Sequence, residues 1–280
     1  MFQYALGKTL ALRYGAELVL DIFWFSDMGE STPRHYMLDA FSVADRFATK
    51  DEIMRLSRTS NSLVRKIFRK LSLASTQYIK EPHYAYWAGI ENISPPVLLK
   101  GYWQNELYFN QKPDVIRKVF SFPDFPTHQA KVLAEQITAC PNAVSVHLRR
   151  GDYVSNSKVN QHHGLCSPEY YATAMRFLRE NIAGDLHLFI FSDEPDWAKA
   201  HFSTPGFPSQ VVDFPEFQTT PWHDMHLMSL CKHHIIANSS FSWWGAWLSG
   251  DQGVICAPKV WVASEGRAND SPVPDRWVRF

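Results

Sequence analysis

Apolar residues in the second half of the chain form two patterns that alternate along the sequence. Short continuous apolar runs, which predict buried strands, lie at 143–148, 186–191, 210–212, 234–237 and 253–257. Apolar residues at helical spacing, which predict helices, lie between them at 168–181, 195–202, 224–232 and 242–248. Strands that alternate with helices usually form a parallel sheet with right-handed crossovers. We therefore expect an α/β fold that binds ligands at the carboxyl ends of its strands.

The first half of the chain is less regular. Residues 1–14 carry apolar side chains at helical spacing, and Gly15 provides a helix stop before the apolar run 17–22. A second helical pattern at 50–73 interleaves Arg and Lys with apolar residues. The simpler interpretation of this pattern is a solvated helix face. The alternative is peripheral contact with a membrane surface or with an anionic lipid-linked acceptor.

Prolines mark the division between the two halves. They recur at positions 95, 96, 113, 123 and 126, which predicts that 91–127 consists mostly of loops with short elements. The end of this proline-rich stretch makes 128–140 the natural place for a domain boundary. We therefore expect two domains, 1–135 and 136–280, which is a comfortable division for a chain of 280 residues.

Composition narrows the classes of protein that fit. The chain has 28 Lys and Arg against 28 Asp and Glu, so it offers no overall field that would attract nucleic acid. Its four cysteines include no C-x-x-C pair, which indicates reduced thiols rather than disulfides or zinc ligands. The longest apolar stretches are far shorter than a bilayer span, and no signal peptide follows Met1. We expect a cytoplasmic protein, with peripheral contact at the inner face of the membrane as the alternative.

Two arginines follow the predicted strand 143–148. The sequence His147-Leu148-Arg149-Arg150-Gly151-Asp152-Tyr153 places polar residues at the sheet edge where ligands bind. Neighbouring residues of an extended chain point in opposite directions, so one arginine is free to enter a cleft while the other braces the loop. The planar, always-charged guanidinium of Arg149 suits a leaving diphosphate, and Asp152 can hold it by paired hydrogen bonds. A purely structural Arg–Asp pair at a turn fits the spacing equally well.

A serine cluster follows the predicted strand 234–237. Asn238, Ser239, Ser240 and Phe241 stand where the next helix begins, so hydroxyls and backbone N–H groups converge on its positive end. That arrangement predicts an anion site for a diphosphate. An ordinary serine N-cap is the alternative, and it explains one hydroxyl more easily than several.

Two carboxylates stand at the starts of other predicted helices. Asp193 and Asp224 are either helix caps or acceptors for the paired N–H donors of guanine. The chain has no D-x-D triplet, and the histidine pairs 162–163 and 233–234 lack carboxylates at ligand spacing. We therefore expect no metal site.

Four sequence blocks together resemble the bacterial α1,2-fucosyltransferases of glycosyltransferase family 11. They are M-F-Q-Y-A-L-G-K at 1–8, H-L-R-R-G-D-Y at 147–153, F-S-D-E-P-D-W at 191–197 and N-S-S-F-S-W-W-G-A-W-L at 238–248. The resemblance implies an α/β fold of the GT-B type, with two Rossmann-like domains facing across a cleft. In that arrangement 1–135 would be the acceptor-side domain and 136–280 the GDP-fucose-binding domain.

The same resemblance implies an activity that needs no metal or other cofactor. L-fucose would be transferred with inversion from GDP-β-L-fucose to the 2-hydroxyl of a galactose in a surface oligosaccharide or its lipid-linked precursor. Carried over by position, Arg149 would bind the β-phosphate of the donor and Asp152 would brace this arginine. These two residues are the expected catalytic pair.

The other residues of the matching blocks would bind the donor. Asp224 would face guanine, and Ser239, Ser240 and Phe241 would line the diphosphate pocket. Asp193 is a weaker assignment in the same site. His147, Arg150 and Asn238 complete the set of expected substrate-binding residues.

The chain departs from the family pattern at its start and at the expected base. A short strand and a G-G-L-G-N-Q loop usually precede the M-F-Q-Y helix, so we expect the N-terminal strand of the first domain to be missing. The related α1,6 enzymes have a carboxylate a few residues past the arginine block, but 154–160 contains none. Two alternatives follow: transfer of another GDP-sugar or to another hydroxyl, and an inactive remnant that binds nucleotide or glycan.

Overall fold

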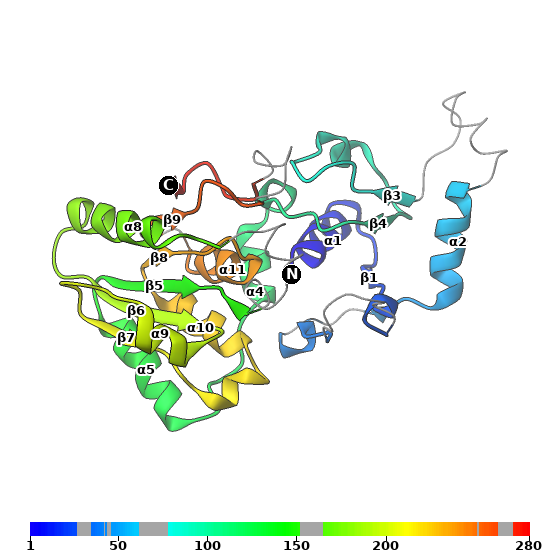
Figure 1. Cartoon of the computed structure of the whole chain (residues 1–280). Coiled ribbons are helices and arrows are strands. Elements are labelled where there is room, and N and C mark those ends of the chain that lie inside the picture. Colours follow the sequence, from blue (N-terminus) through cyan, green and yellow to red (C-terminus); the bar gives the residue numbers. More distant parts are fainter. Residues whose placement is uncertain are drawn as a thin grey trace. The chain divides into compact units, whose positions relative to one another are not determined.

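The computed structural model describes residues 1–26, 35–41, 43, 46–61, 78–151, 165–250, 252–262 and 271–280. The chain forms two compact units, Met1–Ser121 and Phe122–Phe280 (Figure 1). The boundary between the two compact units, at 121/122, lies earlier in the chain than the expected domain boundary at 135/136. Helix α5 (His128–Ala139) packs within the second unit, which accounts for the difference. The division of function between 1–135 and 136–280 stays a prediction.

The second unit contains a six-stranded parallel sheet, which confirms the predicted α/β class. Its strands are β5 (Ala143–Leu148), β6 (His187–Ser192), β7 (Ser209–Val211), β8 (His233–Ile235), β9 (Ile255–Ala257) and β10 (Val278–Arg279). The strand order is β10-β9-β8-β5-β6-β7, and every pairing is parallel. The chain therefore moves in one direction from β5 through β6 to β7, and in the other from β8 to β10. The switch point between β5 and β8 is where such sheets bind ligands.

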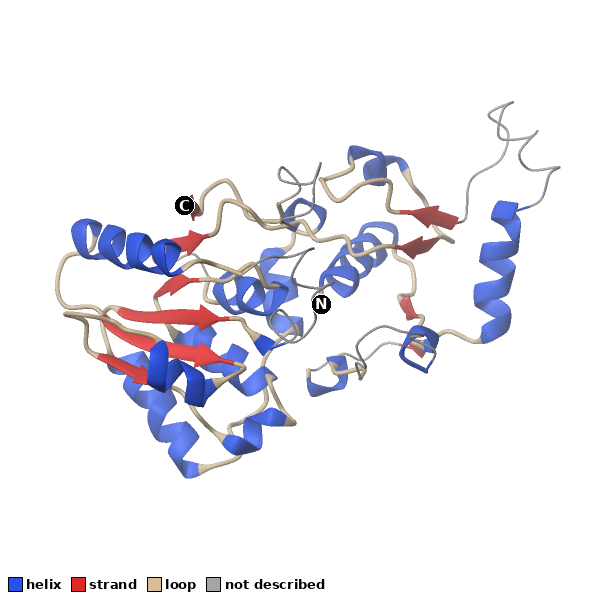
Figure 2. Cartoon of the chain, in the orientation of Figure 1, coloured by secondary structure: helices blue, strands red, loops and turns tan. Residues whose placement is uncertain are grey.

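Helices cover both faces of this sheet (Figure 2). They are α5, α8 (Pro168–Asn181), α9 (Pro195–His201), α10 (Trp222–Leu230) and α11 (Ser240–Leu248), with a 3-10 helix, η5, at Pro215–Gln218. Side chains alternate along β6: Leu188 and Ile190 join a buried cluster with α8, and Phe189 and Phe191 join another with α5 and α10. Two apolar layers therefore hold the strands, which fixes the positions of the strand ends.

The first unit consists of short elements. Its helices are α1 (Phe2–Tyr14), α2 (Lys50–Asn61) and α4 (Pro113–Val119), and its 3-10 helices are η1 (Phe23–Ser26), η2 (Leu38–Ala40), η3 (Ala88–Asn92) and η4 (Glu106–Tyr108). Its strands form two parallel pairs, β1 (Val19–Leu20) with β2 (Arg46–Phe47), and β3 (Tyr78–Lys80) with β4 (Leu98–Lys100). The described part of this unit has no larger sheet.

Helix α1 contributes six buried side chains to the first unit. Gly15 ends it with a φ of 60°, as expected for a left-handed C-cap. Tyr4 packs its ring 5.6 Å from that of Phe120, and Phe2 packs 6.2 Å from Phe109. The predicted helix 50–73 is described only as far as Asn61, and the remainder of that prediction lies outside the described residues. Across the described ranges, no helix has both the length and the apolar composition to cross a bilayer.

Candidate functional site

The ends of β5 and β6 bring two predicted site residues together. Leu148 and Ser192 are partners in the parallel register, so the next residues, Arg149 and Asp193, leave the sheet side by side. Arg149 Nη1 lies 2.8 Å from Asp193 Oδ2, and about a quarter of each side chain is exposed. The ion pair therefore stands at the carboxyl edge of the central strand, partly open to solvent.

Asp193 also fixes the backbone of the arginine loop. Its Oδ1 accepts a hydrogen bond of 2.9 Å from the backbone N–H of Arg150. A Cβ at Gly151 would lie 2.5 Å from Asp193 Oδ2, so only glycine lets the carboxylate approach this closely. Asp152, the expected brace of Arg149, lies outside the described residues. Among the described residues, Asp193 is a carboxylate that pairs with Arg149.

Arg150 turns to a different set of partners, as the alternation along an extended chain predicts. Its Nε lies 3.2 Å from Glu194 Oε2, and its guanidinium carbon lies 3.5 Å from the ring centroid of Trp197. A guanidinium that is both ion-paired and stacked braces the loop against α9. Sequence reasoning did not identify these two partners, although both belong to the F-S-D-E-P-D-W block. Direct contact of Arg150 with a substrate stays a prediction.

His147 is a buried histidine beside this loop. It is 5% exposed, and its Nδ1 has no hydrogen-bond partner among the described residues. Burial, and then the charge of Arg149, lowers the pKa of His147 to about 3, so the imidazole is neutral at pH 7. Its ring lies 5.8 Å from that of Phe241 at the start of α11. Because this nitrogen is buried, contact of His147 with a substrate stays a prediction.

The serine cluster forms the start of α11 at the end of β8. Ser239 is the N-cap, and its Oγ accepts a 3.3 Å hydrogen bond from the N–H of Phe241. The neighbouring residue Ser240 is exposed, whereas Asn238 is buried and donates from Nδ2 to the carbonyl of Trp261 over 3.4 Å. The serine N-cap, which was the alternative for this cluster, is therefore present, and the anion site stays a prediction for the same helix start.

Asp224 lies in the first turn of α10 and is partly buried. Within the described structure its carboxylate makes no hydrogen bond, so it does not act as a helix cap. Burial, and then the negative charge of Asp213, raises the pKa of Asp224 from 3.8 to about 7. A desolvated carboxylate of this kind gains stability from a ligand that donates paired N–H groups.

Histidines of the second predicted pair have structural partners. His234 is fully buried, with Nδ1 2.7 Å from Ser145 Oγ and Nε2 2.9 Å from Ser249 Oγ. His233 Nδ1 accepts a 3.0 Å hydrogen bond from the N–H of Val254. In the ranges that the structure covers, no three His, Cys, Asp or Glu side chains gather as metal ligands. The absence of a metal from the reaction stays a prediction.

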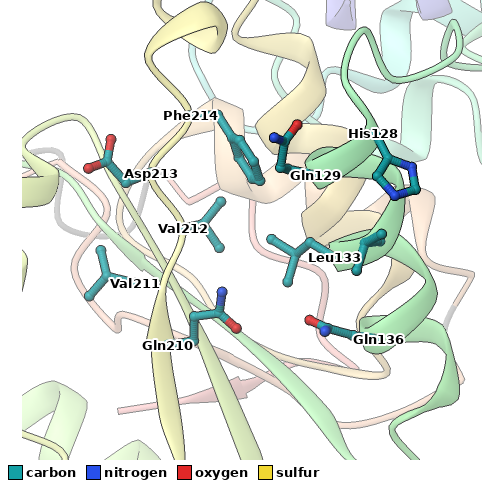
Figure 3. A pocket seen from close by; sticks show the side chains of 10 residues that line it. His128, Gln129, Leu133, Gln136, Gln210, Val211, Val212, Asp213 and Phe214 are labelled. Carbon is teal, nitrogen blue, oxygen red and sulfur yellow. The ribbon is translucent and has the colours of Figure 1, made fainter.

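A separate hollow of about 360 Å³ lies between α5 and the edge strand β7 (Figure 3). Its walls carry glutamines and apolar residues, including Gln129, Leu133 and Gln210. Figure 3 shows that Asp213 points away from the α5 side chains on the opposite wall. None of the predicted site residues lines this hollow. It is therefore distinct from the group of side chains around Arg149.

Comparisons with known proteins agree with the sequence blocks. Residues 50–280 match the model of Glycosyl transferase family 11. The chain is 38% identical over 283 residues to an alpha-1,2-colitosyltransferase of Escherichia coli, covering 100% of the chain and 94% of that protein. It is 30% identical over 296 residues to the O-antigen biosynthesis glycosyltransferase WbnK of Escherichia coli, covering 100% and 96%.

The chain is also similar, at lower sequence identity, to a human protein and to a solved structure. The chain is 26% identical over 170 residues to the galactoside alpha-(1,2)-fucosyltransferase 1 of Homo sapiens, covering 58% of the chain and 46% of that protein. Among solved structures, the fucosyltransferase NodZ from Bradyrhizobium superposes with a TM-score of 0.47 at 14% identity, covering 87% of the chain and 86% of NodZ.

Proposed function

The chain belongs to glycosyltransferase family 11, and on that premise we propose that it is a galactoside α1,2-fucosyltransferase. The reaction would transfer L-fucose with inversion from GDP-β-L-fucose to the 2-hydroxyl of a galactose. The observation that carries this proposal is the Arg149–Asp193 pair at the carboxyl end of β5, next to the switch point that β5 forms with β8. A guanidinium held at that edge is suited to a diphosphate leaving group.

Arg149 would bind the β-phosphate of the donor. A guanidinium has five N–H donors, so Arg149 can keep its bond to Asp193 while it donates others to phosphate oxygens. Negative charge grows on the β-phosphate as the bond to fucose breaks, and a fixed guanidinium stabilises that charge without reorganising. The start of α11, with Ser239, Ser240 and Phe241, would bind the same diphosphate through N–H groups and hydroxyls.

Asp224 would recognise the guanine. Two N–H groups of guanine can donate to one carboxylate, and a carboxylate whose pKa is raised by burial would gain stability from them. His147 would contribute to the site from beside the arginine loop, where its buried ring lies next to Phe241. Asp193 would act in the site through Arg149, and Asp152 is retained as the second member of the catalytic pair.

The wider arrangement that we propose is that of the GT-B enzymes. Residues 136–280 would bind GDP-fucose, and 1–135 would bind a galactose-containing oligosaccharide or lipid-linked glycan. We place the protein in the cytoplasm, with peripheral contact at the inner face of the membrane through 50–73 as the alternative to a solvated helix face. The relative WbnK, named for O-antigen biosynthesis, supports a surface glycan as the product.

Transfer of colitose is a second candidate function. It is favoured by the 38% identity to an alpha-1,2-colitosyltransferase over the whole chain. Colitose is the 3-deoxy form of fucose, so the two donors differ by one hydroxyl. A site that hydrogen-bonds this hydroxyl would reject the deoxy sugar by roughly 10⁴-fold or more, whereas an apolar site discriminates weakly.

A donor panel with EDTA present tests both candidates. The full chain is incubated with GDP-fucose, GDP-colitose or GDP-mannose and a β-galactoside, and GDP release and product linkage are measured. We expect GDP release with GDP-fucose and an α1,2-linked product. Faster turnover of GDP-colitose would move the assignment to the second candidate. Turnover of GDP-mannose alone, an absolute need for manganese, or GDP binding without turnover would contradict the proposed function.

A further inference from the structure

The loop after β4 in the first unit turns two neighbouring aromatic residues in opposite directions. The ring of Trp103 is buried, at 1% exposure, and lies 5.5 Å from Tyr108 and 6.5 Å from Trp87. Tyr102, one residue earlier, is 58% exposed. Trp103 has a φ of 55°, which is an unfavourable backbone conformation for a bulky residue. This turn therefore costs conformational free energy, and it leaves the side chain of Tyr102 exposed to solvent.

Hydrogen bonds from outside the loop hold this turn in place. Glu81 accepts from the N–H of Tyr102 over 2.7 Å through one carboxylate oxygen and from the N–H of Trp103 over 3.0 Å through the other. Gln3 Nε2 donates to the carbonyl of Gly101 over 2.9 Å. A Cβ at Gly101 would lie 2.4 Å from Glu81 Cβ, so the close approach of Glu81 requires glycine. Tyr102 therefore projects from a braced backbone.

A second tyrosine completes the surface. The ring of Tyr84 lies nearly parallel to that of Tyr102, with centroids 6.0 Å apart and planes inclined by 18°. Tyr84 is partly buried, so it supports Tyr102 from one side. We call this pair the tyrosine platform. Its faces are apolar, and its hydroxyls are able to donate and accept hydrogen bonds at the rim.

The size of the tyrosine platform limits what it can bind. Two tyrosine rings bury at most roughly 300–500 Å² in total, well below the approximately 800 Å² per partner of a stable protein interface. The exposed ring of Tyr102, with Tyr84 stacked beside it, suits a single sugar ring, whose C–H face packs on an aromatic face while its hydroxyls reach polar groups at the edge. The exposed aromatic ring, its parallel support and its braced backbone together favour a pyranose over a protein.

We propose that the tyrosine platform, Tyr84 with Tyr102, binds a sugar ring of the acceptor glycan by stacking. The inference rests on the proposed function for its setting and adds to it two acceptor-binding residues. These residues act on binding of the acceptor and have no part in the chemistry at the donor phosphate.

Acceptor kinetics of tyrosine variants test the proposal. We expect Tyr102→Ala to raise the acceptor KM by about 5- to 20-fold, because stacking on one ring is lost. The KM for GDP-fucose should stay unchanged. Tyr102→Phe keeps the ring, so its acceptor KM should stay within about threefold of the wild type. Trp24→Ala is the matched control, since Trp24 is another exposed aromatic of the first unit, at 52%, and should leave both KM values unchanged.

Direct binding separates failure of this inference from failure of the proposed function. Saturation-transfer NMR with β-galactosides requires no turnover, and we expect contact signals with the wild type and Tyr102→Phe that weaken in Tyr102→Ala. If no GDP-sugar is turned over but this difference persists, the proposed function fails and the platform stands. If GDP-fucose is turned over and Tyr102→Ala matches the wild type in acceptor KM and NMR signals, the platform is wrong. Equal losses for donor and acceptor with Tyr102→Ala would also contradict it.

Discussion

The two compact units hold their exposed functional side chains by different means. In the second unit, Arg149 leaves a fully buried strand whose neighbours are fixed by apolar layers on both faces of a six-stranded sheet. In the first unit, Tyr102 leaves a three-residue strand of a two-stranded sheet and depends on the hydrogen bonds of Glu81. The difference suggests a division of work. A rigid sheet edge suits a fixed charge at the reaction centre, and a loop surface suits recognition that varies between glycans.

The largest effect on turnover that we expect comes from substitution of Arg149 at the end of β5. Arg149→Ala should lower turnover of GDP-fucose by about 10²–10³-fold, because the growing charge on the leaving diphosphate loses its main partner. Arg149→Lys keeps the charge but loses the planar fork, so it should recover only part of the rate. The measurement is kcat at saturating donor and acceptor, with thermal melting to verify the fold. Turnover of Arg149→Ala within threefold of the wild type would remove Arg149 from the reaction.

Substitution of Asp193, which pairs with Arg149, should have a smaller effect on turnover. Asp193→Asn should lower kcat by roughly 10–100-fold, since the guanidinium keeps its charge but loses an ion pair that orients it. Asp196→Asn is the matched control, because the side chain of Asp196 is 97% exposed and pairs only with Lys199 over 3.4 Å among the described contacts. Equal rates for the two variants would show that the orientation of Arg149 does not depend on Asp193.

The raised pKa of Asp224 predicts that a rise in pH lowers the folding stability but strengthens donor binding. Its pKa is raised in the folded protein, so the folded state holds the proton more tightly, and the stability contributed by the neutral form falls as pH rises from about 4 to about 7. Asp224→Asn should therefore raise the free energy of unfolding by roughly 1–2 kcal/mol at pH 8 and change it little at pH 4. Urea titrations at the two pH values measure this difference.

The carboxylate form of Asp224 is the form that would accept from guanine. The KM for GDP-fucose in the wild type should therefore fall as pH rises through about 7, and Asp224→Asn should show a higher KM without this trend. A variant that is destabilised at pH 8, or a donor KM that does not change with pH, would count against the placement of guanine at Asp224.

The smallest expected effect concerns the support of the first unit's loop. Glu81→Gln weakens two hydrogen bonds that the carboxylate accepts, so it should lower the free energy of unfolding by about 1 kcal/mol and raise the acceptor KM by about two- to fivefold. The donor KM should not change. A response confined to the donor KM would break the proposed division of work between the units, because it would connect this loop to the nucleotide.

The sequence predicted the sheet of the second unit better than its borders. The strand at 143–148 and the helix at 168–181 agree with β5 and α8 residue for residue, because a continuous apolar run and a capped amphipathic pattern leave little choice. Strand β10 was missed, since two residues carry no period. Helix α5 was missed as a helix because the prolines before it dominated the prediction. Thr127 caps that helix, accepting from the N–H of Ala130.

The sequence pattern could not predict contacts between segments that are distant along the chain. The pairing of Arg149 with Asp193 depends on the register of β5 with β6, and only the structure supplies that register. The sequence located both residues at strand ends, and its prediction that Asp152 braces Arg149 lies outside the described residues. The tyrosine platform was equally hidden, because it depends on the positive φ of Trp103 and on Glu81, 21 residues before Tyr102. The pattern of polar and apolar residues predicts which residues lie at the strand ends, whereas the partners of their side chains depend on the tertiary structure.

Calorimetric binding of GDP and GMP to the wild type and to Arg149→Ala tests the central claim most directly, because only GDP carries a β-phosphate. If Arg149 binds that phosphate, the wild type should prefer GDP, and the variant should lose about 10–100-fold in affinity for GDP while its affinity for GMP changes less than about twofold. Equal losses for both nucleotides, or no loss for either, would contradict the assignment of Arg149 to the leaving diphosphate.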